Sequence, residues 1–135
     1  MKKKNVSVTI LVILIILCLL PLIIWTFRLD RFGFSNQKWI DFIKYDGILY
    51  ESEKIDQTTR VAISVEFIGE KIGEVKFKIV GNVHSPYYIL RNFDATVLEK
   101  GTAFYEIIDE KYTDSYAVKI DNEYFIYTYI PRDWQ

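Results

Sequence analysis

The stretch from Val6 to Phe27 contains no charged residue and constrains the fold more than any other feature of the chain. Its last 20 residues alone would span about 30 Å as a helix, which is the thickness of a bilayer's hydrocarbon core. Because backbone polar groups inside a bilayer must be satisfied within the segment, a single span has to be helical. Trp25 and Phe27 stand where an interfacial aromatic belt lies, and Arg28 follows at the level of the headgroups. The stretch therefore predicts one transmembrane helix over residues 6–27.

Two other interpretations of this stretch are a cleaved signal peptide and a lipoprotein signal. A signal peptide has an apolar region of about 7 to 15 residues that ends in small residues, whereas this run is longer and no Ala-x-Ala-like site follows it. Lipidation at Cys18 usually requires a small residue before the cysteine, but Leu17 precedes it and the apolar run continues beyond it. An uncleaved anchor is the favoured interpretation, and possible cleavage of the segment is left open.

The charges that flank the predicted helix favour a cytosolic N-terminus. Three lysines at positions 2 to 4 and the terminal amine precede the helix, and Arg28, Arg31 and Lys38 follow it. Positive residues concentrate on the cytosolic side, and a short, densely charged tail is costly to translocate. We therefore expect residues 1–5 to form a cytosolic tail and the rest of the chain to lie outside, in a single-pass protein of the cell membrane.

The part beyond the helix is acidic and large enough for one domain. Three of the 17 basic residues precede the helix, which leaves 14 basic against 18 acidic residues outside, a net charge of −4. Binding to a nucleic-acid backbone requires clustered Lys and Arg, so no nucleic-acid partner is expected. The lone cysteine lies in the apolar stretch, so no disulfide can staple the outer part. A chain of this size can still bury a core.

The outer part shows the period-two alternation of short strands. Residues 28–38 contain turn formers without a clean period and are predicted to be a linker, with a β-rich domain over residues 39–135. Asp46-Gly47, between two apolar runs, is a strong hairpin signal. Hydrophobic and polar residues alternate over 60–67 and again over 73–79, which predicts two half-buried strands.

Further short strands are expected along the rest of the domain: at 87–90, 96–98, 103–108, 116–120 and 124–130, the last two flanking a turn at Asp121-Asn122. Six to eight short strands at this spacing favour a mainly β fold. The expected architecture is the single N-terminal transmembrane helix followed by a small antiparallel β sandwich or partly open barrel.

No set of residues predicts catalysis, a metal site or a cofactor. His84 is the only histidine and sits in a turn-rich segment, so a solvated loop position is favoured over a zinc ligand, which would need two or three further protein ligands. Glu66, Glu70 and Glu74 lie near one predicted loop, but Glu66 and Glu74 fall on outward faces of their strands. The chain has no nucleophile elbow and no glycine-rich phosphate loop. A hydrolase that uses Glu66 or Glu74 with His84 is kept as an alternative.

The ten tyrosines are the unusual feature of the composition. Tyrosine combines an apolar body with a polar tip, so exposed clusters make good contact surfaces for peptides or sugars. Tyr87, Tyr88, Tyr127 and Tyr129 are predicted as a possible binding surface. The alternative is that strands simply favour aromatic residues and that these side chains face the core. The last strand is also a candidate sheet edge, open to strand addition and ended by Pro131.

Several short motifs together resemble one group of proteins. They are Trp39-Ile40-Asp41-Phe42, Asp46-Gly47-Ile48-Leu49-Tyr50, Ile72-Gly73-Glu74-Val75, Asp94-Ala95-Thr96-Val97-Leu98 and Gly101-Thr102-Ala103-Phe104-Tyr105. This order is similar to small, uncharacterised secreted or membrane-tethered β-domain proteins of Gram-positive bacteria, although Asp109-Glu110 stands where that group has a Gly-Tyr pair. The resemblance implies an extracytoplasmic β domain of unknown role and carries no functional residues.

Taken together, these features predict a membrane-anchored extracytoplasmic binding or interaction module rather than an enzyme. Its expected partners are membrane lipid, contacted by residues 6–27, and a membrane or envelope protein or a cell-wall polymer. The alternatives are the membrane-bound hydrolase and a structural subunit of an envelope complex.

Overall fold

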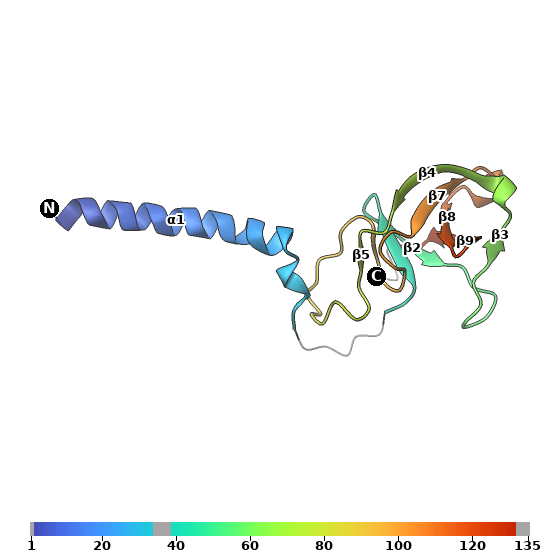
Figure 1. Ribbon diagram of the computed structural model, residues 1–135, viewed down its shortest axis with the longest axis horizontal. Coiled ribbons are helices and arrows are strands. Elements are labelled where there is room, and N and C mark those ends of the chain that lie inside the picture. The colour runs from blue at the N-terminus through green and yellow to red at the C-terminus, as the bar shows by residue number, and fades with distance from the viewer. Residues whose placement is uncertain (1, 34–38, 132–135) are drawn as a thin grey trace. The chain divides into compact units, whose positions relative to one another are not determined.

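The computed structural model describes residues 2–33 and 39–131, and the side chains from Ser7 onward. Within it the chain forms two compact units (Figure 1). The first combines the N-terminal 36 residues with Val83–Ile89, and the second contains Gln37–Asn82 together with Leu90–Gln135. The final part of the predicted linker, residues 34–38, and the C-terminal residues 132–135 lie outside the described residues.

The first unit is dominated by α1 (Lys2–Thr26), the long blue helix of Figure 1. Its stretch Ser7–Thr26 is long and apolar enough to cross a membrane, with a mean hydropathy of 3.2, and none of it is buried within the protein. Pro21 lies inside the helix without ending it, as membrane helices tolerate. The helix starts within the predicted tail, and a short 3-10 helix, η1 (Leu29–Arg31), follows it.

The second unit is one curled, partly open barrel, so the fold is mainly β as predicted (Figure 1). Strands follow the order β4-β7-β8-β9-β2-β1-β6-β5, and β3 also pairs with β9. All pairs are antiparallel except β5 with β6. The bounds are β1 (Phe42–Tyr45), β2 (Ile48–Ser52), β3 (Ala62–Ile63), β4 (Ile68–Glu74), β5 (Phe77–Lys78), β6 (Asp94–Ala95), β7 (Ala103–Ile107), β8 (Ser115–Ile120) and β9 (Glu123–Tyr129), with 3-10 turns η2 (Val65–Phe67) and η3 (Glu110–Tyr112).

Both predicted hairpins are confirmed. Asp46 and Gly47 both have positive φ, at 49° and 77°, and join β1 to β2 in register with Tyr45 opposite Ile48. Two consecutive residues with positive φ are the pattern of a type I′ turn, whose twist matches that of the paired strands. The β8–β9 hairpin turns at Asp121, also with positive φ, and pairs Ile120 with Glu123.

Interlocked aromatic rings fill much of the core of the second unit. Phe104 is fully buried, and its ring lies 4.9 Å from that of Tyr116 and 5.5 Å from that of Tyr45. Tyr116 in turn meets Tyr50 edge to face at 4.9 Å. Such pairs contribute about 0.5–1.5 kcal/mol beyond the burial of their area. Tyr45, Tyr50 and Tyr116 therefore belong to the core or pack against it.

Four strand predictions are wrong in their bounds or existence. The segment 60–67 is not one strand, because only β3 is extended and η2 follows at once, leaving Val65 exposed. The segment 73–79 is divided between β4 and β5, although its inward residues Val75 and Ile79 are buried as expected. No strand forms at 87–90. At 96–98 no strand forms, because β6 ends at Ala95. Alternation reports which side chains face inward, but a strand also requires a neighbour with which to exchange hydrogen bonds.

Candidate functional site

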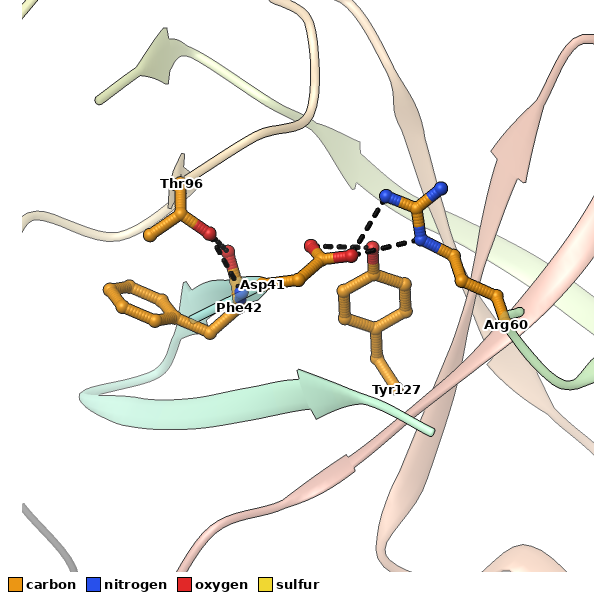
Figure 2. A network of polar contacts seen from close by, with 5 residues as sticks. All are labelled: Asp41, Phe42, Arg60, Thr96 and Tyr127. Atoms are coloured by element: carbon orange, nitrogen blue, oxygen red, sulfur yellow. Dashed lines mark hydrogen bonds and ion pairs between the residues drawn. The ribbon is translucent and has the colours of Figure 1, made fainter. Parts of the chain in front are cut away.

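A buried carboxylate just before β1 joins three parts of the second unit (Figure 2). Asp41 is 7% exposed, and its Oδ1 accepts a hydrogen bond from the Tyr127 hydroxyl on β9 at 3.0 Å. Its Oδ2 accepts from Arg60 Nε at 2.9 Å and lies 2.8 Å from Arg60 Nη2. We call Asp41, Arg60 and Tyr127 the Asp41 network.

The backbone that follows Asp41 is fixed as firmly as its side chain. The Phe42 amide donates to the hydroxyl of the fully buried Thr96 at 2.8 Å (Figure 2). The Thr96 amide donates back to the Phe42 carbonyl at 3.0 Å. The Asp41 carbonyl accepts from the Ser52 amide on β2 at 2.9 Å. These bonds leave the carboxylate little freedom to move.

The electrostatics of the network favour a structural role. Burial, and then the charge of Asp41, raise the pKa of the Tyr127 phenol well above its ordinary value, so this hydroxyl remains a donor. Burial opposes the charge of Arg60, but Tyr127 and Asp41 beside it raise the pKa of the guanidinium on balance. Both carboxylate oxygens are engaged by donors. The network therefore holds the β9 and Arg60 segments to the start of β1.

An open groove of about 470 Å³ lies where β2 and β9 end, and we call it the Tyr129 groove. Its apolar residues are Ile40, Tyr129, Ile130 and Pro131, and the acidic residues Glu51 and Glu53 belong to its lining. The hydroxyl residues Ser52 and Thr128 complete the lining. Among the described residues, neither glutamate makes an ion pair. The lining therefore combines apolar residues with two acidic ones.

A second hollow of similar size adjoins the Asp41 network. Its lining includes Trp39, Lys54, Thr58 and Arg60, and it shares Ile40 with the Tyr129 groove. Its basic residues are only partly available to a ligand, because Arg60 is already engaged by Asp41. The Tyr129 groove is accordingly the stronger candidate site.

The four tyrosines predicted as a binding surface fall into two classes. Tyr127 is fully buried and Tyr88 is 8% exposed, so the prediction is wrong for these two, whose hydroxyls bind Asp41 and Arg28 respectively. Tyr87 is 86% exposed and Tyr129 is 40% exposed. For this exposed pair the predicted binding surface stays a hypothesis. Tyr129 also lines the Tyr129 groove.

The last strand is not a sheet edge, which corrects the expectation of strand addition there. β9 pairs with β8 on one side and with β2 and β3 on the other. The strands at the two ends of the sheet order are β4 and β5. Pro131 lies beyond β9, as predicted, and lines the Tyr129 groove.

The residues of the hydrolase alternative lie on the surface. His84 is exposed in the loop of the first unit, as expected for a solvated loop position. In the second unit Glu66 in η2 and Glu74 at the end of β4 are exposed, and Glu74 pairs with Lys71 at 3.1 Å. Among the described residues, no group of three His, Cys, Asp or Glu side chains could hold a metal ion.

Tyr127, Tyr129 and Pro131 were singled out from the sequence, but the charged residues of the groove and the network were not. Glu51 and Glu53 are two positions apart, and this spacing places both on one face of a strand. That signal was present, but its meaning depends on β9, which lies about 75 positions further along the chain and pairs with β2. Asp41 and Arg60 carry no local signal, since each is an ordinary charged residue until the fold buries it.

Comparisons with known proteins provide no relative for this chain: no family model, curated protein or solved structure matches it. The resemblance to small membrane-tethered β-domain proteins stays a prediction.

Proposed function

We propose that the chain is a non-enzymatic binding module tethered to the outer face of the cell membrane. Helix α1 supports the anchor, because its apolar side chains are unburied within the protein and span the length of a bilayer core. The three N-terminal lysines support a cytosolic N-terminus under the positive-inside rule. The β domain would then face the cell exterior.

The Tyr129 groove is the binding site of this proposal, and its occupant is a short segment of a membrane or envelope protein. The carrying observation is that its lining combines apolar residues, Tyr129 among them, with two acidic ones, Glu51 and Glu53, that have no ion-pair partner among the described residues. An apolar side chain next to a lysine or arginine matches this surface. The net charge of −4 outside the membrane would also draw a basic segment toward the domain.

The test uses the full chain in lipid nanodiscs and two fluorescent peptide pools. One pool alternates Leu, Ile or Val with Lys or Arg, and the matched pool carries Asp or Glu at the charged positions. We expect the basic pool alone to raise its fluorescence anisotropy on binding. Tyr129→Ala should weaken this binding about tenfold, which corresponds to about 1.4 kcal/mol, because a half-exposed tyrosine is a typical interface anchor.

Matched variants distinguish binding by the groove from nonspecific attraction to the acidic domain. Glu51→Gln with Glu53→Gln should weaken binding, whereas Glu66→Gln with Glu70→Gln removes two exposed carboxylates outside the groove lining and should leave it unchanged. The folded state of Tyr129→Ala is checked by its denaturant unfolding curve, which should shift by less than about 1 kcal/mol. Equal binding of both pools, or full binding by Tyr129→Ala, contradicts the proposal. Binding of cell-wall fragments without either pool would contradict the peptide occupant alone.

The structural-subunit alternative differs from this proposal in the permanence of the contact. A partner that remains bound through purification in detergent, independently of Tyr129, would favour it. An exchangeable partner that depends on the groove would favour the binding module.

A further inference from the structure

The loop Val83–Ile89 is held against the residues that leave helix α1. The Arg31 carbonyl accepts hydrogen bonds from the amides of His84, at 2.8 Å, and Ser85, at 3.2 Å. The Ile89 amide donates to Asp30 Oδ2 at 3.2 Å, and Arg28 Nη1 donates to the Tyr88 hydroxyl. Residues 28–31, predicted to be part of a linker, are therefore built into a small folded unit with this loop.

Close packing and internal hydrogen bonds support the same conclusion. A Cβ added to Gly33 would lie 3.0 Å from the Cα of Ser85, so the two backbones touch at this point. Within the loop, the Tyr87 amide donates to Ser85 Oγ at 3.2 Å, which forms a local turn. The loop is thus a shaped structure.

The position of η1 along the chain places this unit close to the bilayer surface. The helical hydrogen bonding continues to Phe27, whose amide donates to the Ile23 carbonyl at 3.0 Å, and Arg28 is the first charged residue. A 3-10 helix rises about 2.0 Å per residue, so η1 extends about 6 Å. The headgroup layer on each side of the hydrocarbon core is about 5 to 7 Å thick. If α1 spans the membrane, η1 and the loop bonded to it lie at the depth of the headgroups.

The loop presents apolar side chains in an alternating pattern. Tyr87 is 86% exposed and Ile89 is 58% exposed, whereas Tyr88 between them turns inward to Arg28. Phe32, beside η1, is 61% exposed. Exposed apolar residues of this size favour burial, and tyrosine is enriched where membrane meets water because its ring is apolar and its tip polar.

We propose that the loop Val83–Ile89 is a second membrane contact, in which Tyr87 and Ile89 enter the boundary between headgroups and acyl chains beside the exit of α1. The occupant of this apolar surface is lipid, because the surface continues the apolar side chains of the anchor through residues hydrogen-bonded to its end. This inference rests on the proposed membrane anchoring. It adds that a loop distant in sequence from the helix belongs to the membrane-bound part of the protein.

The test measures the depth of single fluorescent probes in the full chain. A Cys18→Ala background carries either Ile89→Cys or Ile108→Cys, labelled with an environment-sensitive dye and reconstituted in vesicles of phosphatidylcholine and phosphatidylglycerol. Ile108 is a matched control, because it is 63% exposed and belongs to the second unit. Quenching is measured with a nitroxide lipid and with aqueous iodide.

We expect the Ile89 probe to be quenched several-fold more by the nitroxide lipid, and several-fold less by iodide, than the Ile108 probe. Changing Tyr87 to Ser in the Ile89→Cys background should reduce the quenching by lipid. Equal quenching at both positions, or an Ile89 probe open to iodide, would overturn the second contact. Flotation of the same vesicles tests the anchor separately: protein that floats while its Ile89 probe stays in water refutes the loop contact alone, and protein that does not float refutes the anchor.

Discussion

Tyr127 and Tyr129 are two positions apart on β9 and share one face of the strand, yet they have opposite environments. Tyr127 is fully buried under the Asp41 network, whereas Tyr129 is 40% exposed and lines an open groove. Asp41 supplies a charged partner for the Tyr127 hydroxyl, whereas Tyr129 lines a groove that is open to solvent. One aromatic face of a strand therefore carries a buried tyrosine at one position and a partly exposed tyrosine two residues further along.

The largest expected effect on stability comes from substitutions that break the Asp41 network around the buried Tyr127. Asp41→Ala removes the acceptor of Tyr127 and Arg60 together and should cost about 3 kcal/mol of unfolding free energy, near the lower end for a broken buried pair because Arg60 can turn toward water. Tyr127→Phe removes one hydrogen bond to a charged group and should cost about 1.5 kcal/mol. Denaturant unfolding of the full chain in detergent micelles measures both. Equal stability of wild type and Asp41→Ala would show that the Asp41 network does not stabilise the fold.

An intermediate effect is expected from Tyr50, which pairs with Tyr129 across the strands but points into the core. Burial, and then the neighbouring Tyr116, raise the pKa of Tyr50 from its ordinary value of 10.0 to about 12. Because the unfolded chain ionises first, the stability that this group contributes is complete below pH 10 and is lost as the pH rises toward about 12.

The measurement for Tyr50 is the slope of unfolding free energy against pH in this alkaline range. Tyr50→Phe should reduce the slope, while Tyr127, whose pKa is also raised, keeps part of it. The control is Tyr129→Phe, which alters an exposed phenol on the same sheet. An unchanged slope in Tyr50→Phe would mean that this phenol is not sheltered.

The smallest effect is expected at Asp56, in the exposed loop that leads to Arg60. The backbone amides of Thr58 and Thr59 donate to Asp56 Oδ1, both at 2.8 Å, and lower the pKa of this carboxyl from 3.8 to about 2. A lowered pKa means that the contribution is present above pH 3.8 and is lost as the pH falls toward about 2.

Asp56→Asn retains an oxygen acceptor and removes the titration, so it should flatten the stability curve slightly in this acid range. The shift of the urea midpoint between pH 3.8 and about 2, compared with wild type, measures the effect. If the wild-type curve is already flat there, the turn does not favour the ionised carboxylate, and the loop that holds Arg60 is stabilised by other contacts.

Local signals in the sequence predict local structure well. Asp46-Gly47 gave the β1–β2 hairpin, because two adjacent residues with positive φ admit few other conformations. Val75 and Ile79 were correctly expected to be buried, although the strand around them is broken. The segment 60–67 failed because its alternation occurs where the chain turns into η2, a choice made by the surrounding contacts.

The candidate site could be predicted only in part. Tyr129 was proposed from the clustering of tyrosines, but Tyr127 was proposed with it, since local pattern does not distinguish two tyrosines on one strand face. To tell the buried tyrosine from the exposed one, the position of Asp41 must be known, and Asp41 lies 86 positions before Tyr127 in the chain. Glu51 and Glu53 became part of a groove only through the pairing of β2 with β9.

By itself, the sequence determined the long apolar helix, the hairpin turns and the mainly β class, because each depends on hydrophobic run length, backbone conformation or periodicity over a few residues. The tertiary structure alone decided which tyrosines are buried, that the loop at 83–89 packs on the exit of the helix, and that Asp41 joins Arg60 to Tyr127. These features depend on groups far apart in sequence meeting at hydrogen-bonding distance, where burial changes the free energy of a charge or hydroxyl more than any local preference does.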